Sequence, residues 1–511
     1  MKHMRKFACL LLALIMVFAL ATTAFATDVT ITAPAGSTRT YEVYQIFTGD
    51  LANNVLSNVK WGKNGTGNEG DTVPQETLDA LVAVNSKSDT DKLAEITRYV
   101  NLDSDKFGIV KDGSPLSAPT GYYLIKDNGP VGEGEAYSLY VVQVVGPTTI
   151  EPKVSKVTSE KKVDDKNDSN STQDKVKWED SADYDIGDDV PFLLKATIAN
   201  DYDNYKVYKL TFHDQESNGL TFQPETVVVK IDGYVVNSKD YTVTSPASDG
   251  HTFDISFTDL KTVVAADNHK AGPKSVITVE YSSILNDNAV LGSTGNPNTM
   301  HITYSNNPND EQGGEKGKTP DDKVIVFTFQ TIVNKVTKNP DYDPKTEGSK
   351  EYIPLKGAEF TLEKFEAKEG GTVTYKDVAG EWVAKTLTKG VDEVTFTSVG
   401  LDDGEYRIHE SKTPDGYNTI EDVYFTITAS HDAESDTPAL TGLNGNVTNG
   451  LVTFTCTPAD GTLSTNVVNN SGTELPSTGG VGTTIFYALG SILVIGAAVL
   501  LVTRKRMSVD A

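Results

Sequence analysis

The stretch VIVFTFQTIVNK, residues 324–335, alternates its side chains at a spacing of two. Successive side chains of a β-strand point to opposite faces of the sheet, so this period predicts a strand. The residues that share its apolar face are Phe327, Phe329, Thr331, Val333 and Lys335. We therefore expect Lys335 to point toward the same core as the phenylalanines.

Short segments rich in Val, Ile, Phe and Tyr, separated by turns, continue on both sides of this strand. They group into a first unit over residues 27–150, which also has a helical pattern over 74–101, and a second unit over 151–322. The second unit ends in a polar linker over 306–322, and a third unit spans 323–472. The fold class is predicted to be mainly β, with tandem β-sandwich domains of which the first has an added helix.

The N-terminus has the three parts of a secretory signal peptide. Lys2, Arg5 and Lys6 precede an apolar run over 7–21, and the small-residue site Ala-Phe-Ala follows at 24–26. The run is short for a membrane span. We expect residues 1–26 to be removed by cleavage after Ala26.

The C-terminus combines three signals in a fixed order. The pentapeptide Leu475-Pro476-Ser477-Thr478-Gly479 precedes an uncharged run over 483–503 and a basic tail over 504–511. The run is long enough to span a bilayer as a helix, and the tail would stay in the cytoplasm. The alternative is an ordinary single-pass anchor with a chance pentapeptide.

This tripartite C-terminus resembles the sorting signal read by sortases. The resemblance implies cleavage between Thr478 and Gly479, with Leu475 and Pro476 as recognition residues. The transmembrane helix is then removed on maturation, and the Thr478 carboxyl is joined to an amine. The expected location is the cell wall and cell surface of a Gram-positive bacterium.

Composition excludes some partners and one source of stability. The net charge is −26, which argues against nucleic acid or anionic lipid as a partner. Of the two cysteines, Cys9 leaves with the signal peptide, so Cys456 has no partner for an intrachain disulfide. Without a disulfide, the mature chain either has another source of stability or does not need one.

Four further segments carry a family resemblance. PLKGAEFTL (354–362) and YRIHESKTPDGY (406–417) are similar to the Cna B-type sandwich and its E-box, while FHDQESNGL (212–220) and ITYSNNP (302–308) resemble the middle domain of Gram-positive major pilins. The resemblance implies Ig-like (Cna A/B-type) sandwiches and a backbone subunit of a surface pilus, or fimbria.

In this family a sandwich can be locked by a Lys–Asn isopeptide bond. The chemistry needs a buried, neutral lysine, an adjacent Asn carboxamide and a buried carboxylic acid that moves protons. In the third unit the resemblance and the strand faces indicate Lys335, Asn469 and the catalytic acid Glu410, with Asn470 as the alternative amide. In the second unit they indicate Lys161, Asp214 and Asn298. Asn306 and Lys162 remain the alternatives there.

A sortase-built polymer also needs an amine on the next subunit. The segment TIEPKV, residues 149–154, partly resembles the pilin motif at the junction of the first two domains. The resemblance indicates Lys153 as the polymerisation lysine and leaves Lys156 as an alternative. The partners implied are pilin-class and housekeeping sortases, identical subunits, minor pilins, peptidoglycan and a host surface ligand.

No turnover enzyme, cofactor or metal site is predicted. The seven His are scattered along the chain without metal-ligand spacing, and there is no phosphate-binding loop or nucleophile elbow. The leading hypothesis is a structural shaft subunit. The alternative, from a different functional class, is a monomeric wall-anchored adhesin or minor pilin that binds a host ligand.

Overall fold

The computed structural model describes residues 28–472, with gaps at 53–54, 85, 88, 145, 152–155, 170–175, 309, 311, 315 and 368–379, and also residue 495. The predicted signal peptide, the sorting pentapeptide, the basic tail and Lys153 lie outside the described residues, as does the apolar run except for residue 495. Within the part that is described, no helix is long and apolar enough to cross a membrane.

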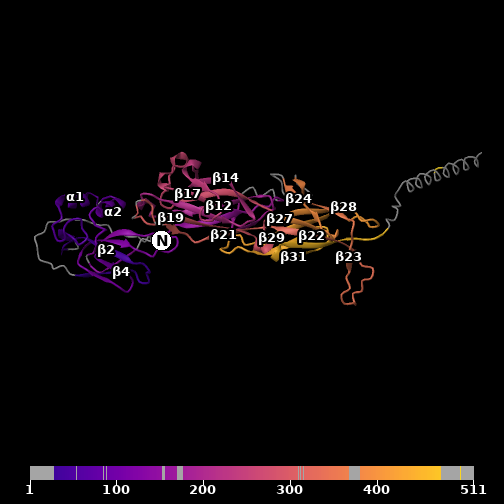
Figure 1. Cartoon of the computed structure of the whole chain (residues 1–511), viewed down its shortest axis with the longest axis horizontal. Helices are drawn as coiled ribbons and strands as arrows, with labels where there is room; N and C mark the ends of the chain where they lie inside the picture. Colours follow the sequence, from indigo (N-terminus) through magenta and orange to yellow (C-terminus); the bar gives the residue numbers. More distant parts are fainter. Residues whose placement is uncertain are drawn as a thin grey trace, which may run out of the picture.

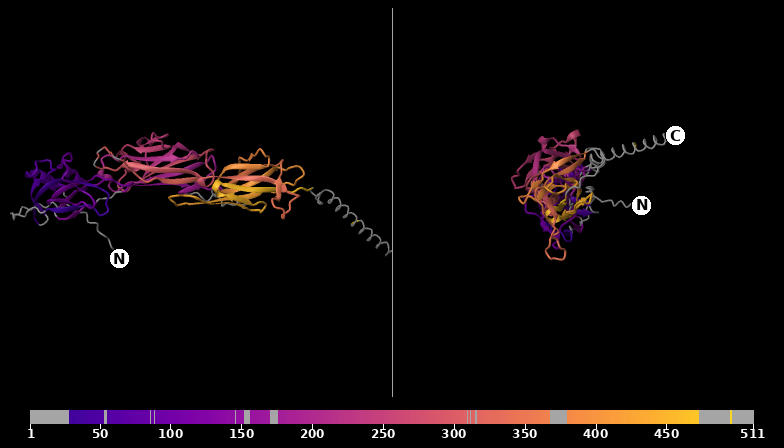
Figure 2. Two further views of the ribbon diagram at one scale, coloured as in Figure 1. Left: turned by 60° about the horizontal axis from the view of Figure 1, so that its bottom comes forward. Right: turned by 90° about the vertical axis from the view of Figure 1, so that its right-hand side faces the viewer.

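The described chain forms three bodies that follow one another along the long axis, in sequence order (Figure 1). A second view shows the same row (Figure 2). Strands dominate all three bodies, and the α-helices of residues 28–472 lie in the first. The predicted mainly β fold class, with helix added to the first unit, is confirmed.

The first body pairs a five-stranded sheet, β3-β2-β6-β7 with β4 beside β2, with a three-stranded sheet, β5-β1-β8. Two short helices replace the single predicted helical stretch, and they bury Leu78, Leu81 and Ile96 against the larger sheet. The elements are β1 (Val29–Thr32), β2 (Tyr41–Ala52), β3 (Val55–Trp61), α1 (Gln75–Ala83), α2 (Asp89–Thr97), β4 (Gly108–Val110), β5 (Leu116–Ala118), β6 (Gly121–Asp127), β7 (Leu139–Val144) and β8 (Thr148–Thr149).

The second body is a sandwich of two sheets, ordered β10-β9-β12-β18-β14-β15 and β11-β21-β19-β13-β17-β16, with β20 beside β19. Its strands are β9 (Thr158–Asp164), β10 (Trp178–Glu179), β11 (Ser181–Asp183), β12 (Asp189–Thr197), β13 (Leu210–Glu216), β14 (Leu220–Ile231), β15 (Tyr234–Val235), β16 (Thr242–Thr244), β17 (Phe253–Phe257), β18 (Val276–Leu285), β19 (Asn296–Ser305), β20 (Lys316–Lys318) and β21 (Asp322–Phe327). Its short 3-10 turns are η1 (Tyr202–Asn204), η2 (Ser238–Asp240), η3 (Leu260–Thr262), η4 (Ala266–Asn268) and η5 (Gly292–Thr294).

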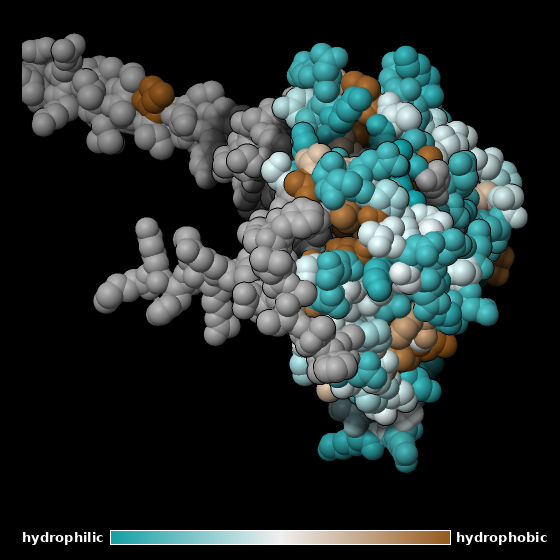
Figure 3. Space-filling view, turned by 90° about the vertical axis from the view of Figure 1, so that its left-hand side faces the viewer, coloured by the Kyte–Doolittle hydropathy of each residue, from teal (hydrophilic) through white to brown (hydrophobic). Residues whose placement is uncertain are grey.

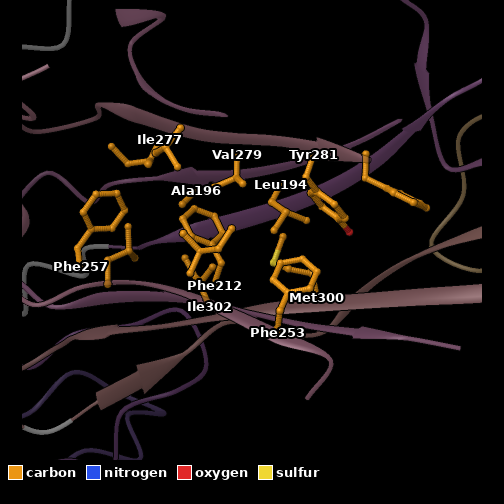
Figure 4. Packing of buried hydrophobic residues seen from close by; sticks show 14 of the residues in the cluster. Leu194, Ala196, Phe212, Phe253, Phe257, Ile277, Val279, Tyr281, Met300 and Ile302 are labelled. Atoms are coloured by element: carbon orange, nitrogen blue, oxygen red, sulfur yellow. The ribbon is translucent and has the colours of Figure 1, made fainter. Parts of the chain in front are cut away.

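Alternate residues of the facing strands fill the space between these sheets. In Figure 4, Leu194 and Val279 from one sheet face Phe212, Phe253 and Ile302 from the other. All five are fully buried. The period of two in the sequence is therefore the period of core burial.

The strand β21 changes the predicted boundary between the second and third units. The stretch that begins at residue 324 was assigned to the third unit, but Val324 pairs with Asn298 of β19, and Val326 pairs with Ala182 of β11. The strand therefore completes the second sandwich, and the chain enters the third with β22. The apolar alternation continues without interruption from β21 into β22. The sequence pattern therefore does not mark the point where the chain passes from the second sandwich to the third.

The third body is a sandwich of sheets ordered β26-β27-β22-β32-β31, with β23 beside β22, and β25-β24-β28-β29-β30. Its elements are β22 (Phe329–Lys338), β23 (Tyr352–Pro354), β24 (Glu359–Ala367), β25 (Gly380–Lys385), β26 (Thr388–Lys389), β27 (Thr395–Leu401), β28 (Gly404–Lys412), β29 (Val423–His431), β30 (Leu440–Val447), β31 (Phe454–Thr457), the 3-10 turn η6 (Pro458–Asp460) and β32 (Thr462–Asn469). The first strand, β22, lies beside the last, β32, and runs parallel to it.

The second and third sandwiches pack closely at their junction. A Cβ on Gly292 would lie 2.3 Å from the Gly461 backbone nitrogen, and one on Gly400 would lie 2.6 Å from the Ile186 side chain. Both glycines have positive φ, 71° and 80°, which glycine adopts without strain. The Ile186 amide donates to the Gly400 carbonyl at 3.0 Å. At these two positions the sandwiches therefore approach so closely that there is no room for a side chain on either glycine.

A buried charge cluster crosses the same junction. Lys364 of the third sandwich contacts Asp402 and lies 2.9 Å from Asp185 of the second. All three side chains are buried. Burial opposes the charged ammonium, but Asp402 and Asp185 outweigh it and raise the pKa of Lys364. The lysine thus serves as the shared counter-ion of two carboxylates from different sandwiches.

We expect the junction to be more stable at pH 5 than at pH 8. Burial and Asp183 raise the pKa of Asp403 to about 8, and burial and Asp185 raise that of Asp188 to about 6. An unfolded Asp titrates near pH 4, so between about pH 4 and 8 the folded chain holds protons that the unfolded chain releases. This contribution to stability is therefore lost as the pH rises from about 4 to 8.

The raised pKa of His431 acts in the same direction, because its contribution is lost as the pH rises through that value. Carboxylates with lowered pKa, such as Asp232, act in the opposite direction only below about pH 4. Burial lowers the pKa of His301 to about 4, so this histidine opposes the trend between about pH 4 and 6.5, but the raised carboxyl groups of Asp403 and Asp188 together outweigh it. Thermal unfolding of the full chain at pH 5 and pH 8 should show a melting temperature lower by a few degrees at pH 8. Asp403→Asn should reduce the difference, and a higher melting temperature at pH 8 would contradict the expectation.

The end of the molecule formed by the first body has a mostly hydrophilic surface (Figure 3). Figure 3 looks along the row from the end formed by the first body, and hydrophilic residues dominate this face, with small scattered hydrophobic patches.

Candidate functional site

The structure brings together all three residues predicted in the third sandwich. Lys335 lies on β22 and Asn469 ends the adjacent strand β32, while Glu410 lies on β28 of the opposite sheet. In the parallel register Lys335 is opposite Val467, so Asn469 is two positions further along and on the same face. Each side chain points inward because of the strand alternation that predicted it.

The three side chains contact one another in the buried core. Lys335 Nζ contacts Asn469 Oδ1 and lies 3.3 Å from Glu410 Oε1. Asn469 Nδ2 donates to both Glu410 oxygens, at 3.0 and 3.2 Å. The exposed fractions of Lys335, Glu410 and Asn469 are 0%, 3% and 0%. Burial lowers the pKa of Lys335, which favours the neutral amine that can act as a nucleophile.

The carboxyl group of Glu410 is held in place by the loop that follows its strand. The Ile420 amide donates to Glu410 Oε2 at 3.1 Å, and the Thr413 hydroxyl donates to the same oxygen at 3.3 Å. The alternative amide, Asn470, is exposed, and its backbone carbonyl accepts from Asn418. The geometry therefore favours Asn469 over Asn470 as the partner of Lys335.

The second sandwich also gathers its predicted residues, from both of its sheets. Lys161 lies on β9, Asp214 on β13 and Asn298 on β19, and all are fully buried. Lys161 Nζ contacts Asp214 Oδ2 and donates to the Tyr281 hydroxyl at 2.9 Å. Asn298 Nδ2 donates to the same hydroxyl at 2.9 Å. The Tyr281 hydroxyl in turn donates to Asp214 at 3.2 Å, so it joins the three predicted residues.

Burial shifts the acid–base balance of this second site. It lowers the pKa of Lys161 and raises the pKa of Asp214. A second carboxyl, Glu216, lies 3.5 Å from Asn298 Nδ2, and burial and Asp214 raise its pKa to about 7. Near neutral pH the site can therefore supply both a protonated carboxyl and an amine of reduced basicity.

Sequence reasoning missed Tyr281 and Glu216. Both positions carry a usable signal, because Tyr281 lies on the buried face of the alternating strand β18, and Glu216 follows Asp214 at a spacing of two. The alternatives weighed for this sandwich lie elsewhere. Lys162 pairs with Asp180 at 2.7 Å, and the Asn306 carbonyl accepts from Tyr137 of the first body.

The predicted polymerisation lysine, Lys153, lies outside the described residues. Its alternative, Lys156, is described at the junction of the first and second bodies. The side chain of Lys156 is 64% exposed and lies 3.9 Å from Glu135. An enzyme could therefore reach it.

Three segments of the chain match known protein families. Residues 186–308 match the Cna-B-like domain of the Gram-positive pilin backbone subunit 2, and residues 344–438 match a prealbumin-like fold domain. Residues 467–508 match the LPXTG cell wall anchor motif. The first two matches fall on the two sandwiches that hold the Lys–Asn–acid sets, and the third includes the predicted sorting pentapeptide.

The trypsin-resistant surface T6 protein of Streptococcus pyogenes serotype M6 is 23% identical over 372 residues, which are 63% of this chain. The chain spans about 64% of the length of that relative. Among solved structures, the T6 backbone pilin of the same serotype is 16% identical, covering 87% of this chain and 98% of its own, with a TM-score of 0.49. The major pilin SpaD from Corynebacterium diphtheriae is 17% identical, covering 87% and 97%, with a TM-score of 0.44. The chain is therefore a cell wall-anchored surface protein that carries a Gram-positive pilin-backbone Cna-B-like domain and a prealbumin-like domain, and it is homologous to the T6 surface protein.

Proposed function

We propose that this chain is the structural subunit of the shaft of a covalent pilus, with each of its last two sandwiches locked by an isopeptide bond. The observation that carries the proposal is the buried contact of Lys335, Asn469 and Glu410. The wall-anchor match and the backbone-pilin domain matches support it. A buried lysine against an asparagine has no role in an ordinary apolar core, but it fits a sandwich that is cross-linked once and then bears load.

The bond forms by acyl substitution at the asparagine. The Lys335 amine attacks the Asn469 carboxamide carbon, the new C–N bond forms, and the old C–N bond breaks to release ammonia. The proton lost by the lysine goes to Glu410, which returns a proton to the leaving nitrogen through the bonds to Asn469 Nδ2. In the second sandwich Lys161 and Asn298 react in the same way, with Asp214 as the acid and Tyr281 holding all three groups.

Polymerisation joins the subunits through a second kind of amide bond. A pilin-class sortase exchanges the peptide bond between Thr478 and Gly479 for an amide between the Thr478 carboxyl and Lys153 of the next subunit. A housekeeping sortase then transfers the finished fibre, with its minor pilins, to peptidoglycan, and the anchored fibre can bind a host surface ligand. The exposed junction around Lys156 supports this placement, because the amine must be reachable.

Blotting the boiled cell-wall fraction of the native host tests this function. We expect a ladder of high-mass species from the native chain and a single monomer band from Lys153→Ala, because the mutant lacks the acceptor amine. Lys156→Ala is the matched control, three positions away, and should keep the ladder. A ladder lost only in Lys156→Ala moves the amine to that residue. A monomer band from the native chain contradicts the shaft and leaves a monomeric adhesin.

A further inference from the structure

Three of the chain's seven histidines gather on the outer face of the second sandwich, although they are far apart in sequence. The ring centroids of His213 and His301 lie 4.9 Å apart, and the His251 ring lies 5.2 Å from each. His213 and His301 are direct neighbours on β13 and β19, and His251 stands in the loop before β17. The isopeptide chemistry proposed above uses none of them.

Two aspartates join two of these histidines, His213 and His251, in a set of four candidate ligand groups. His213 Nδ1 lies 2.9 Å from Asp254 Oδ1 and 3.1 Å from Asp249 Oδ2, and His251 Nδ1 lies 2.8 Å from Asp249 Oδ1. One ligand atom from each of these four residues lies within 4.8 Å of all the others. A tetrahedral ion with bonds of 2.0–2.2 Å needs ligand atoms about 3.4 Å apart, so small side-chain movements suffice.

Charge and access also suit a divalent cation. Two neutral imidazoles and two carboxylates carry a charge of −2, which a divalent ion cancels. The His213 and Asp254 side chains are 11% and 16% exposed, while His251 and Asp249 are 26% and 40% exposed. The site is therefore anchored on strands at its base and open to solvent at its rim.

A second hydrogen bond orients the central ligand. His213 Nε2 lies 2.9 Å from the Thr303 hydroxyl, so the ring can donate there while Nδ1 faces the two carboxylates. Metal-binding histidines usually have such a partner on the second nitrogen, which sets the tautomer and the ring direction. The His301 ring also stacks on the His213 ring, with centroids 4.9 Å apart.

We propose that His213, His251, Asp249 and Asp254 form a binding site for a divalent transition metal ion, and that Zn²⁺ is the ion the site takes best. Two nitrogens and two carboxylate oxygens in four-coordination suit Zn²⁺, whereas Ca²⁺ takes six to eight oxygens. The ion would tie the loop before β17 to β13 and β17. We do not propose a metal ion at the carboxylate cluster between the second and third sandwiches. There the Lys364 ammonium already lies between the carboxylates of Asp185 and Asp402.

Calorimetric titration of the full chain with ZnCl₂, in a mild detergent and after treatment with a chelator, tests the site. We expect one Zn²⁺ per chain, proton release on binding, a melting temperature higher by several degrees, and a weaker response to CaCl₂. His213→Ala should weaken binding at least 100-fold, because it removes the ligand that contacts both carboxylates. His409→Ala is the matched control, since His409 lies in the third sandwich, away from the proposed site, and also pairs with an aspartate, Asp422, at 2.7 Å.

His251→Ala provides a second variant in case His213→Ala affects folding, because its side chain lies in a loop and is more exposed. It should weaken Zn²⁺ binding at least tenfold and leave the melting temperature of the metal-free chain unchanged. The proposal is overturned if Zn²⁺ does not bind at one per chain, if both His variants bind it as the native chain does, or if Ca²⁺ binds equally well.

Discussion

Glu410→Gln is expected to lower the melting temperature of the third sandwich by about 10–20 °C, because the Lys335–Asn469 bond no longer forms. The substitution preserves the size of the side chain but removes the carboxyl group that takes a proton from Lys335 and returns one to Asn469. The bond joins residues 134 positions apart. In the chain-entropy model, closing a loop of that length stabilises the fold by about 5 kcal/mol. Calorimetry of the full chain measures the change.

Intact mass separates the loss of the bond from a simple packing defect. Each bond releases one ammonia, so the native chain should be lighter than its processed sequence by two ammonia molecules, about 34 Da. Glu410→Gln should be lighter than its own sequence by only one. Glu359→Gln is the matched control, because Glu359 is a carboxylate of the same sandwich whose side chain is 58% exposed. If Glu410→Gln has a lowered melting temperature but is still lighter than its sequence by two ammonia molecules, Glu410 contributes to packing and not to bond formation.

Local alternation predicted the lysine of the third site and favoured Asn469 over its neighbour Asn470. The period of two placed Lys335 on the buried face of β22, and the structure leaves 0% of that residue exposed. The E-box resemblance identified Glu410 independently of the faces. Strand alternation is a property of neighbouring residues, so the sequence contains it in full.

The second site shows where local pattern is insufficient. Asn298 and Asn306 fall on the same predicted face of one strand, and alternation cannot separate them. The register does, because Asn298 lies opposite Glu216 of β13 while Asn306 lies beyond the end of β19. Register depends on which strand becomes the neighbour, and that is decided by the packing of the whole sandwich.

Long-range pairing also explains the features that sequence reasoning did not find. His213 and His301 become neighbours only because β13 pairs with β19, so their separation in sequence concealed the cluster. The place of β21 was hidden for the same reason, since the strand pairs with β19 while Val324 and Val326 pack in the second core and Ile325 and Phe327 in the third. The charge cluster at the junction needs two folded sandwiches before its members meet.

Lys364→Met is expected to destabilise that junction by about 3–5 kcal/mol. Methionine fills a similar volume, so the main effect is the loss of the ammonium that contacts Asp402 and lies 2.9 Å from Asp185. Lys385 remains 2.7 Å from Asp185, and Asp402 therefore bears most of the loss. A carboxylate that is buried without its counter-ion is far more costly than an exposed one. The midpoint of urea denaturation of the full chain measures the change in the free energy of unfolding.

Two further variants distinguish a buried charge effect from the loss of any lysine. Lys356→Met removes an exposed pair with Glu393 at 3.2 Å and should cost less than 1 kcal/mol. The double variant Lys364→Met/Asp402→Asn removes the stranded charge and should recover much of the stability, because a buried ion pair can often be replaced by neutral groups. If Lys364→Met lowers the free energy of unfolding no more than Lys356→Met does, the buried ammonium does not stabilise the junction. Lys364 can pair with Asp402 and Asp185 together only in one relative orientation of the two sandwiches. Lys364→Met should therefore also widen the range of angles between the second and third sandwiches.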